Sequence, residues 1–291
     1  MLEYHRPASL DEAVALLGRL AGDVNVMAGG VEVLMLISNG TLKPGNVVDL
    51  GGVPGLAGVS RHGDGGLEIG SMTSHRAAER SALLRTECPA LAYACSTVGN
   101  IRIRNQGTIG GNVVRANPIH DLAPVLLALD AEVALTSMDG ERVIRLDEFY
   151  VASFTTVIRP DEVLVTVRVP PVVGASTASY HKHQPGSKGD SGTLGIAIRL
   201  DRDDDGSCVG VAIGLGGLGP VPFRARRAEV ALGGTSLSDD EIRAASALVA
   251  AESDPISDTR GSSEYKRRVA SVLATRALVE LRDRTIAARP T

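Results

Sequence analysis

The stretch IRNQGTIGGNVVRANPIHDLAPVLLAL, residues 103–129, decides how this chain is interpreted. It places a glycine pair, residues 110–111, ahead of an apolar run that begins at Asp121. Two adjacent glycines let successive backbone N–H groups point the same way, with no Cβ between backbone and ligand. Such amides bind a diphosphate, and a helix N-terminus behind them strengthens the binding. The stretch therefore predicts a phosphate-binding loop, to which Thr108 and Asn112 add side-chain hydrogen bonds.

A second glycine pair stands earlier, where a predicted strand over 24–27 runs through Ala28 into a predicted helix over 31–37. Each pair taken alone is more often a simple turn, and neither belongs to a GxGxxG or P-loop motif. Two such loops in one chain favour a phosphate-containing ligand. Asp121 then has two interpretations. It is a carboxylate that caps the apolar helix, or one that accepts hydrogen bonds from the hydroxyls of a ribose.

Length, charge and cysteine content set the limits of these interpretations. The chain has 291 residues, a formal net charge of −4 and three cysteines, which suggests two domains. The cysteines form no CxxC pair, so the pattern excludes a disulfide framework and an iron–sulfur cluster held by this chain alone. The mild acidity argues against nucleic acid as the main partner. No run approaches the roughly 18 apolar residues of a membrane span, and the N-terminus lacks a signal peptide's apolar stretch. We expect a soluble cytoplasmic protein.

Hydrophobic periodicity and turn residues predict the remaining elements. Capping boxes open helices at Ser9 and Ser238, a β-α-β unit spans 24–50, and Pro170–Pro171 is the domain boundary. The further predicted elements are a helix over 75–95 broken at Pro89, an apolar helix over 121–129, a hairpin over 132–146 and strands over 162–169, 194–200 and 208–215. The last predicted helix has Tyr265, Val269, Leu273, Ala277 and Leu281 in one row, with Lys266, Arg267 and Arg268 beside it.

The stretch 103–129 resembles the signature of the FAD-binding subunit of molybdenum hydroxylases. This family includes the medium subunit of aerobic carbon monoxide dehydrogenase and the flavin domain of xanthine dehydrogenase. Three further segments match it: YHRPASLDEAVALL (4–17), AGGVEVL (28–34) and SDPISDTRGSSEYKRRVASVLATRAL (253–278). The resemblance covers nearly the whole chain.

The resemblance implies an α+β fold. A PCMH-type FAD-binding domain would span 1–171, in subdomains of about 1–55 and 56–171. A smaller α+β domain with an antiparallel sheet and helices would span 172–291. The residues that would bind FAD are Ala28, Gly29, Gly30, Val31 and Glu32 in the first phosphate loop, and Thr108, Gly110, Gly111 and Asn112 in the second. Asp121 would bind the adenosine ribose, and either Lys182 or Lys188 would approach the flavin ring.

Several positions depart from the family pattern. Val31 stands where the family usually has Thr, Ser or His, and Arg115, Asn117 and His120 replace smaller residues. Arg115 either points inward and adds positive charge near the phosphates, or is a solvated arginine. Ser191 stands where relatives often have an aromatic residue. His181 and His183 would share one face of a strand, but with no third ligand in view we expect exposed or ring-contacting histidines and no metal site.

The resemblance implies an electron-transfer role with no catalytic side chain. Substrate would be oxidised at molybdenum in a large subunit, and two [2Fe-2S] clusters of a small subunit would pass electrons to FAD and an external acceptor. A stand-alone FAD-dependent oxidoreductase is an alternative, motivated by the altered segment 180–191. A divergent copy that has lost FAD is another, motivated by Val31.

Overall fold

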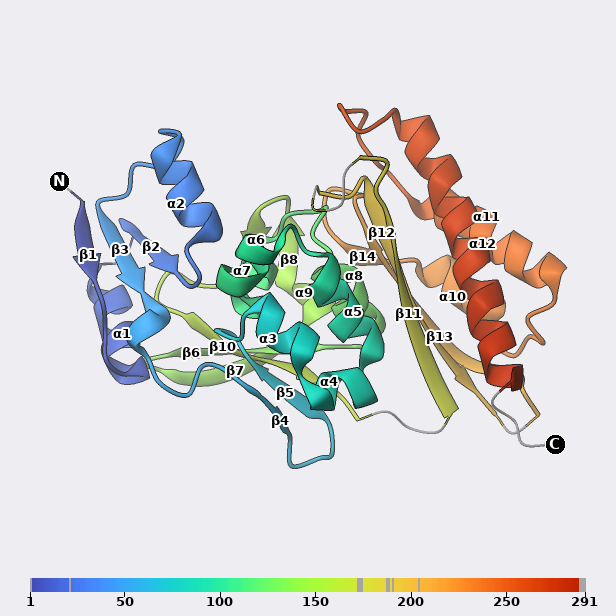
Figure 1. Cartoon of the computed structure of the whole chain (residues 1–291), viewed down its shortest axis with the longest axis horizontal. Coiled ribbons are helices and arrows are strands. Elements are labelled where there is room, and N and C mark those ends of the chain that lie inside the picture. The colour runs from blue at the N-terminus through green and yellow to red at the C-terminus, as the bar shows by residue number, and fades with distance from the viewer. Residues whose placement is uncertain are drawn as a thin grey trace.

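The computed structural model describes residues 2–20, 22–171, 175–186, 189, 191–203 and 205–287, so Lys188 lies outside the described residues. Three parts follow one another along the chain: an N-terminal lobe, a central unit and a C-terminal sheet with its helices (Figure 1). The mixture of helices with mainly antiparallel sheets is the predicted α+β fold. Within the described residues no helix is long and apolar enough to cross a membrane.

The N-terminal lobe is a small parallel sheet with two α-helices. Its elements are β1 (Glu3–His5), α1 (Leu10–Arg19), β2 (Val24–Met27), α2 (Val31–Ser38), β3 (Asn46–Asp49) and the 3-10 helix η1 (Leu50–Gly52). The strand order is β1-β3-β2, and the parallel pairing of β2 with β3 confirms the predicted β-α-β unit. Ser9 caps α1 by accepting a hydrogen bond from the Glu12 N–H at 3.1 Å. The reverse hydrogen bond of this capping box is shifted by one residue, because the Glu12 carboxylate accepts from the N–H of Ala8, the residue before the N-cap, at 2.7 Å.

The central unit is a five-stranded antiparallel sheet with short helices. Its elements are β4 (Val59–Arg61), β5 (Leu67–Gly70), α3 (His75–Arg80), α4 (Ala82–Glu87), α5 (Pro89–Thr97), α6 (Ile101–Gln106), α7 (Ile109–Arg115), α8 (Leu122–Ala128), β6 (Glu132–Ser137), β7 (Gly140–Arg145), α9 (Leu146–Phe149), β8 (Tyr150–Ala152), β9 (Thr155–Thr156) and β10 (Val163–Val169). The sheet order is β4-β5-β10-β6-β7, and β8 pairs with β9 separately.

The predicted break at Pro89 within the helical region 75–95 is confirmed, but a second break at Ser81 was not predicted, so three helices occupy this region. Ser81 ends α3 and at the same time caps α4 by accepting from Leu84 N at 3.3 Å. Pro89 starts α5 at its first position, where a missing N–H costs nothing. The stretch 99–118 forms two helices, α6 and α7, that the sequence did not predict.

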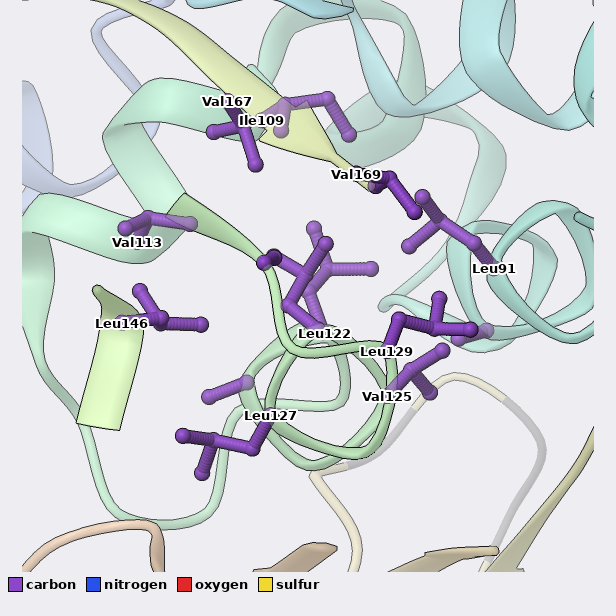
Figure 2. Packing of buried hydrophobic residues seen from close by; sticks show 14 of the residues in the cluster. Leu91, Ile109, Val113, Leu122, Val125, Leu127, Leu129, Leu146, Val167 and Val169 are labelled. Carbon is purple, nitrogen blue, oxygen red and sulfur yellow. The ribbon is translucent and has the colours of Figure 1, made fainter. Parts of the chain in front are cut away.

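Helix α8 is the centre of the main hydrophobic core. All seven of its residues are buried, which explains why its sequence is apolar on every side. Figure 2 shows the packing around it, with these residues labelled: Leu91, Ile109, Val113, Leu122, Val125, Leu127, Leu129, Leu146, Val167 and Val169. The core therefore joins α5, α7, α8 and β10.

The C-terminal part is a four-stranded antiparallel sheet covered on both faces. Its elements are β11 (Ala175–His183), β12 (Leu194–Arg202), β13 (Cys208–Gly216), β14 (Phe223–Arg224), α10 (Arg226–Leu232), α11 (Asp239–Glu252) and α12 (Ser263–Ala287). Helices α5 and α8 pack on one face, and α10 and α12 on the other. Strands covered on both faces bury almost every residue, as β12 does. A Cβ at Gly214 would lie 2.0 Å from the Pro124 carbonyl oxygen, so glycine there permits the approach of α8.

The predicted row of helix α12 is confirmed at Ala277 and Leu281, which are fully buried, and is wrong at Tyr265. Tyr265 is 41% exposed, whereas Lys266 is 2% exposed and begins the buried row that continues through Ala270 and Ala274. The Lys266 ammonium lies 2.8 Å from the Asp258 carboxylate, which compensates the burial of its charge. The capping box at Ser238 is confirmed in both directions.

Candidate functional site

A cavity of about 700 Å³ lies between the N-terminal lobe and the central unit. Nine of the twelve residues expected to bind the cofactor line it: Ala28, Gly29, Gly30, Val31, Glu32, Thr108, Gly110, Gly111 and Asn112. Tertiary folding thus brings the two glycine loops, about 80 residues apart in the sequence, to one cavity. A Cβ at Gly29 would lie 1.7 Å from the Gln106 carbonyl oxygen, so the first loop touches the backbone that leads into the second.

The first loop leaves its backbone donors open. Gly30 has a φ of 73°, a left-handed conformation that glycine adopts readily, and it caps α2 without any side-chain hydrogen bond. Within the described residues, the N–H groups of residues 29–33 make no hydrogen bond. Unpaired amides at a helix N-terminus, together with the helix dipole, form an anion-binding site. This loop can therefore bind a phosphate group.

The backbone N–H groups of the second loop already donate hydrogen bonds inside the protein. Thr108 caps α7, because its hydroxyl accepts from Gly111 N at 3.1 Å. The N–H of Gly110 donates to the Ser71 carbonyl at 2.8 Å, and that of Ile109 donates to the Thr73 carbonyl at 2.9 Å. The Asn112 N–H donates back to Thr108 at 3.0 Å. This loop is the well-bonded start of a helix that borders the cavity, and phosphate binding by it stays a prediction.

Three buried polar atoms without a partner belong to residues that line the cavity: Ser71 Oγ, His75 Nδ1 and Asn112 Oδ1. A buried polar atom without a hydrogen bond is costly, so a polar ligand would stabilise this wall. Burial, with the nearby His120 and Arg104, lowers the pKa of His75 to about 4. Burial also lowers the pKa of His120. Both imidazoles are therefore neutral at pH 7.

Asp121 and Lys182 are close to each other, but neither lines the cavity. The Lys182 ammonium lies 2.9 Å from one oxygen of the Asp121 carboxylate, and the Tyr180 hydroxyl donates to the other at 2.6 Å. Lys182 also donates to the Thr97 carbonyl at 2.9 Å. Burial raises the pKa of Asp121, and the ion pair with Lys182 opposes that change. This network joins the C-terminal sheet to the central unit.

The helix-cap interpretation of Asp121 is wrong, since its side chain makes no capping hydrogen bond to α8. Its contact with the adenosine ribose and the approach of Lys182 to the flavin ring stay predictions. Lys188 has no described position.

The two histidines of β11 point away from Lys182, as alternation along a strand requires. His181 Nε2 lies 3.3 Å from the Glu280 carboxylate of α12. His183 Nε2 lies 2.8 Å from the Tyr265 hydroxyl. In the described part of the chain, no three His, Cys, Asp or Glu side chains gather in a way that could hold a metal ion.

Sequence reasoning missed several cavity residues, among them Ser71, His75 and Phe154. It also missed the ion pair between Arg115 and Glu32, which crosses from the central unit to the lobe. These residues come from separate turns and helix ends, and no local pattern connects them. The departure at Arg115 was the one available signal.

Comparisons with known proteins agree with this architecture. Residues 1–172 match the family described as the FAD binding domain in molybdopterin dehydrogenase. Residues 179–281 match the CO dehydrogenase flavoprotein C-terminal domain. The chain is 32% identical to the carbon monoxide dehydrogenase medium chain of Afipia carboxidovorans over 97% of each chain. It is 34% identical to the 6-hydroxypseudooxynicotine dehydrogenase complex subunit alpha of Paenarthrobacter nicotinovorans, over 99% of this chain and 96% of that one.

Solved structures give the same assignment. A chain of the Cu,Mo-CO dehydrogenase in its cyanide-inactivated form superposes with a TM-score of 0.93 at 32% identity, over 97% of this chain and 98% of that one. A chain of quinoline 2-oxidoreductase from Pseudomonas putida 86 superposes with a TM-score of 0.90 at 26% identity, over 97% of each. This protein therefore belongs to the family of FAD-binding medium subunits of the molybdenum hydroxylases, and it is an oxidoreductase subunit whose cofactor is FAD.

Proposed function

We propose that this chain accepts electrons from [2Fe-2S] clusters of a small partner subunit and passes them through FAD to an external acceptor, in a complex whose large subunit holds molybdenum. The relatives named as medium chains and complex subunits support this assembly. The observation that carries the proposal is the cavity of about 700 Å³ with the open N-terminus of α2 in its wall.

The residues around the cavity fit FAD. The unpaired amides of residues 29–33 match a diphosphate, and adding a Cβ to either Gly29 or Gly110 would disturb the wall. The unpartnered atoms of His75 and Asn112 suit the polar groups of a dinucleotide. We propose that the first loop holds the diphosphate and that Thr108, Gly110 and Gly111 support the cofactor from the adjoining wall. When bound, FAD supplies the redox chemistry.

The chain's own side chains bind and orient in this proposal. The cysteines Cys88, Cys95 and Cys208 are all free and buried. Burial raises the pKa of Cys88 to about 12 and that of Cys208 to about 11, so both remain thiols at pH 7. Cluster ligands must be thiolates. The iron–sulfur clusters would therefore belong to the partner subunit.

We further propose that the chain divides near Pro171 into a FAD-binding domain, 1–171, and a C-terminal domain, 172–291. The network of Asp121, Tyr180 and Lys182 would fix these two units relative to each other. A cytoplasmic location stays a prediction, and the free thiols are in keeping with it.

The test is the visible absorption spectrum of the protein purified from its own cells through an affinity tag, followed by identification of the released cofactor. We expect a flavin spectrum, released FAD, iron–sulfur bands and a molybdenum-containing large chain. Flavin without those chains would favour the stand-alone oxidoreductase. A colourless protein that takes up no added FAD would contradict both functions and favour a copy that has lost its cofactor.

A further inference from the structure

Arg115 is placed to take part in ligand binding, although the family pattern assigns it no role. It lies in the last turn of α7 and lines the cavity. Its Nε donates to the carboxylate of Glu32, in the first turn of α2. Its guanidinium carbon lies 4.4 Å from the centre of the Phe154 ring. One arginine thus connects the lobe, the central unit and the β8–β9 hairpin at the edge of the cavity.

Phe154 is held beneath this arginine by the backbone. Its φ of 63° is in the left-handed region, which is unfavourable for a residue with a large side chain. Its N–H donates to the carbonyl of Ala116 at 2.9 Å, and Ala116 is itself left-handed at the end of α7. Strained backbone of this kind persists where surrounding structure imposes it, often at functional sites.

Most of the donors of Arg115 stay open. A guanidinium has five N–H donors in its plane. Stacking on Phe154 uses the face of the group, and Glu32 takes the Nε edge. The Nη groups make no hydrogen bond within the described residues. The arginine is therefore oriented while its phosphate-binding fork remains available.

The negative charge of Glu32 makes its pairing with Arg115 important for phosphate binding. Its carboxylate is in the first turn of α2, whose open N-terminus is the anion site. An unpaired carboxylate there would repel a phosphate, because like charges in a partly buried site interact strongly. Pairing with Arg115 cancels that charge.

We propose that Arg115 binds the diphosphate of the cofactor and that Glu32 is a positioning residue that orients Arg115. The inference rests on the proposed function, because it assigns the diphosphate of FAD to the N-terminus of α2. Arg159 is the other arginine that lines the cavity. It is exposed, and its side chain makes no hydrogen bond or ion pair among the described residues, so it lacks the fixed orientation of Arg115.

The experiment titrates the full-length, flavin-stripped protein with FAD by fluorescence and with inorganic pyrophosphate by calorimetry. We expect Arg115→Gln to weaken the binding of both by roughly tenfold to hundredfold, the range for a charge-assisted hydrogen bond. The dependence of FAD affinity on salt should fall as well, since one charge contact is lost. Arg115→Lys keeps the charge but not the fork, and should weaken binding less. It also provides a test if Arg115→Gln does not fold.

Glu32→Gln separates positioning from direct contact. We expect it to weaken pyrophosphate binding roughly threefold in the native background and to have no effect in the Arg115→Gln background. Tighter binding in both backgrounds would mean that Glu32 faces the phosphates directly, and would overturn its positioning role.

Two control variants test whether the loss of affinity depends on the position of the arginine and not only on its charge. Arg159→Gln and the exposed Arg80→Gln should leave both affinities unchanged. Equal losses in Arg159→Gln and Arg115→Gln would overturn the proposal, as would native affinity in a folded Arg115→Gln protein. A native protein that binds pyrophosphate through Arg115 but does not bind FAD would contradict the proposed function alone.

Discussion

The two glycine loops have similar sequences but opposite hydrogen-bonding states. In the first loop, the N–H groups of residues 29–33 have no partner within the described residues, and Gly30 caps α2 with no side-chain help. In the second, Thr108 caps α7, and the N–H groups of residues 109–112 all donate within the protein. A glycine pair therefore does not identify a phosphate site by itself. The hydrogen-bond partners of its backbone amides decide whether the loop can bind an anion or only forms part of the cavity wall.

The largest effect should come from Gly29→Ala. The added Cβ would meet the Gln106 carbonyl oxygen, which is backbone and has little room to move. The two loops would separate, and we expect the affinity for FAD to fall about 100-fold. Fluorescence titration of the flavin-stripped variant measures this loss. Gly18→Ala is the matched control, because nothing lies within 4 Å of its added Cβ. Native affinity in a folded Gly29→Ala protein would refute the assignment of the first loop.

The second largest effect should come from acid, which should lower the stability of the protein through His75, a residue that packs beside the second loop. The His75 ring packs against Gly107, and the backbone N–H of His75 donates to the Gly107 carbonyl at 2.9 Å. Because the pKa of folded His75 is lowered from 6.5 to about 4, only the unfolded chain takes up a proton there between these values. Stability is therefore complete above about pH 6.5 and falls as the pH drops, by about 2 kcal/mol at pH 5.

Urea unfolding at pH 7 and pH 5 measures this dependence. His75→Gln should remove about 2 kcal/mol of the difference in unfolding free energy between the two pH values. The same pH dependence in His75→Gln and the native protein would show that His75 does not cause it.

Removing the N-cap of α7 in the second loop should lower the stability of the protein more than its affinity for FAD. Thr108→Ala removes the hydroxyl that accepts from Gly111, and we expect the free energy of unfolding to fall by about 1 kcal/mol. Thr108→Ser keeps the hydroxyl and should restore it. If Thr108→Ala lost as much FAD affinity as Gly29→Ala, both loops would bind phosphate, and the contrast between them would fail.

The smallest effect should come from giving the first loop a side-chain donor. Val31 is the first residue of α2 and lines the cavity, so Val31→Thr would add a hydroxyl beside the open amides. One added hydrogen bond should tighten FAD binding about threefold. Val143→Thr, at an exposed position on β7 outside the cavity wall, is the control. Unchanged affinity in Val31→Thr would mean that the backbone amides already satisfy the ligand.

Much of the local structure was predictable from the sequence. The cap at Ser9, the β2–α2–β3 unit and the strands β12 and β13 follow from spacing and capping residues that act over a few positions. The division of 75–95 into three helices was not predictable from its apolar pattern, because Ser81 works as both an end and a cap. The start of the buried face of α12 was also misplaced, at Tyr265 in place of Lys266, since the ion pair that permits the burial of Lys266 involves Asp258, in the loop before the helix.

The sequence by itself determined the family and, through the resemblance to that family, the FAD cofactor and nine of the residues that line the cavity, because the motifs that carry the resemblance are local patterns. Only the tertiary structure decided which loop keeps open amides, because the carbonyls of Ser71 and Thr73 accept hydrogen bonds from the second loop and from no N–H of the first. It also decided that Asp121 pairs with Lys182 and that Arg115 meets Glu32. Such contacts depend on how distant segments pack, and a residue's own neighbours in the sequence do not encode them.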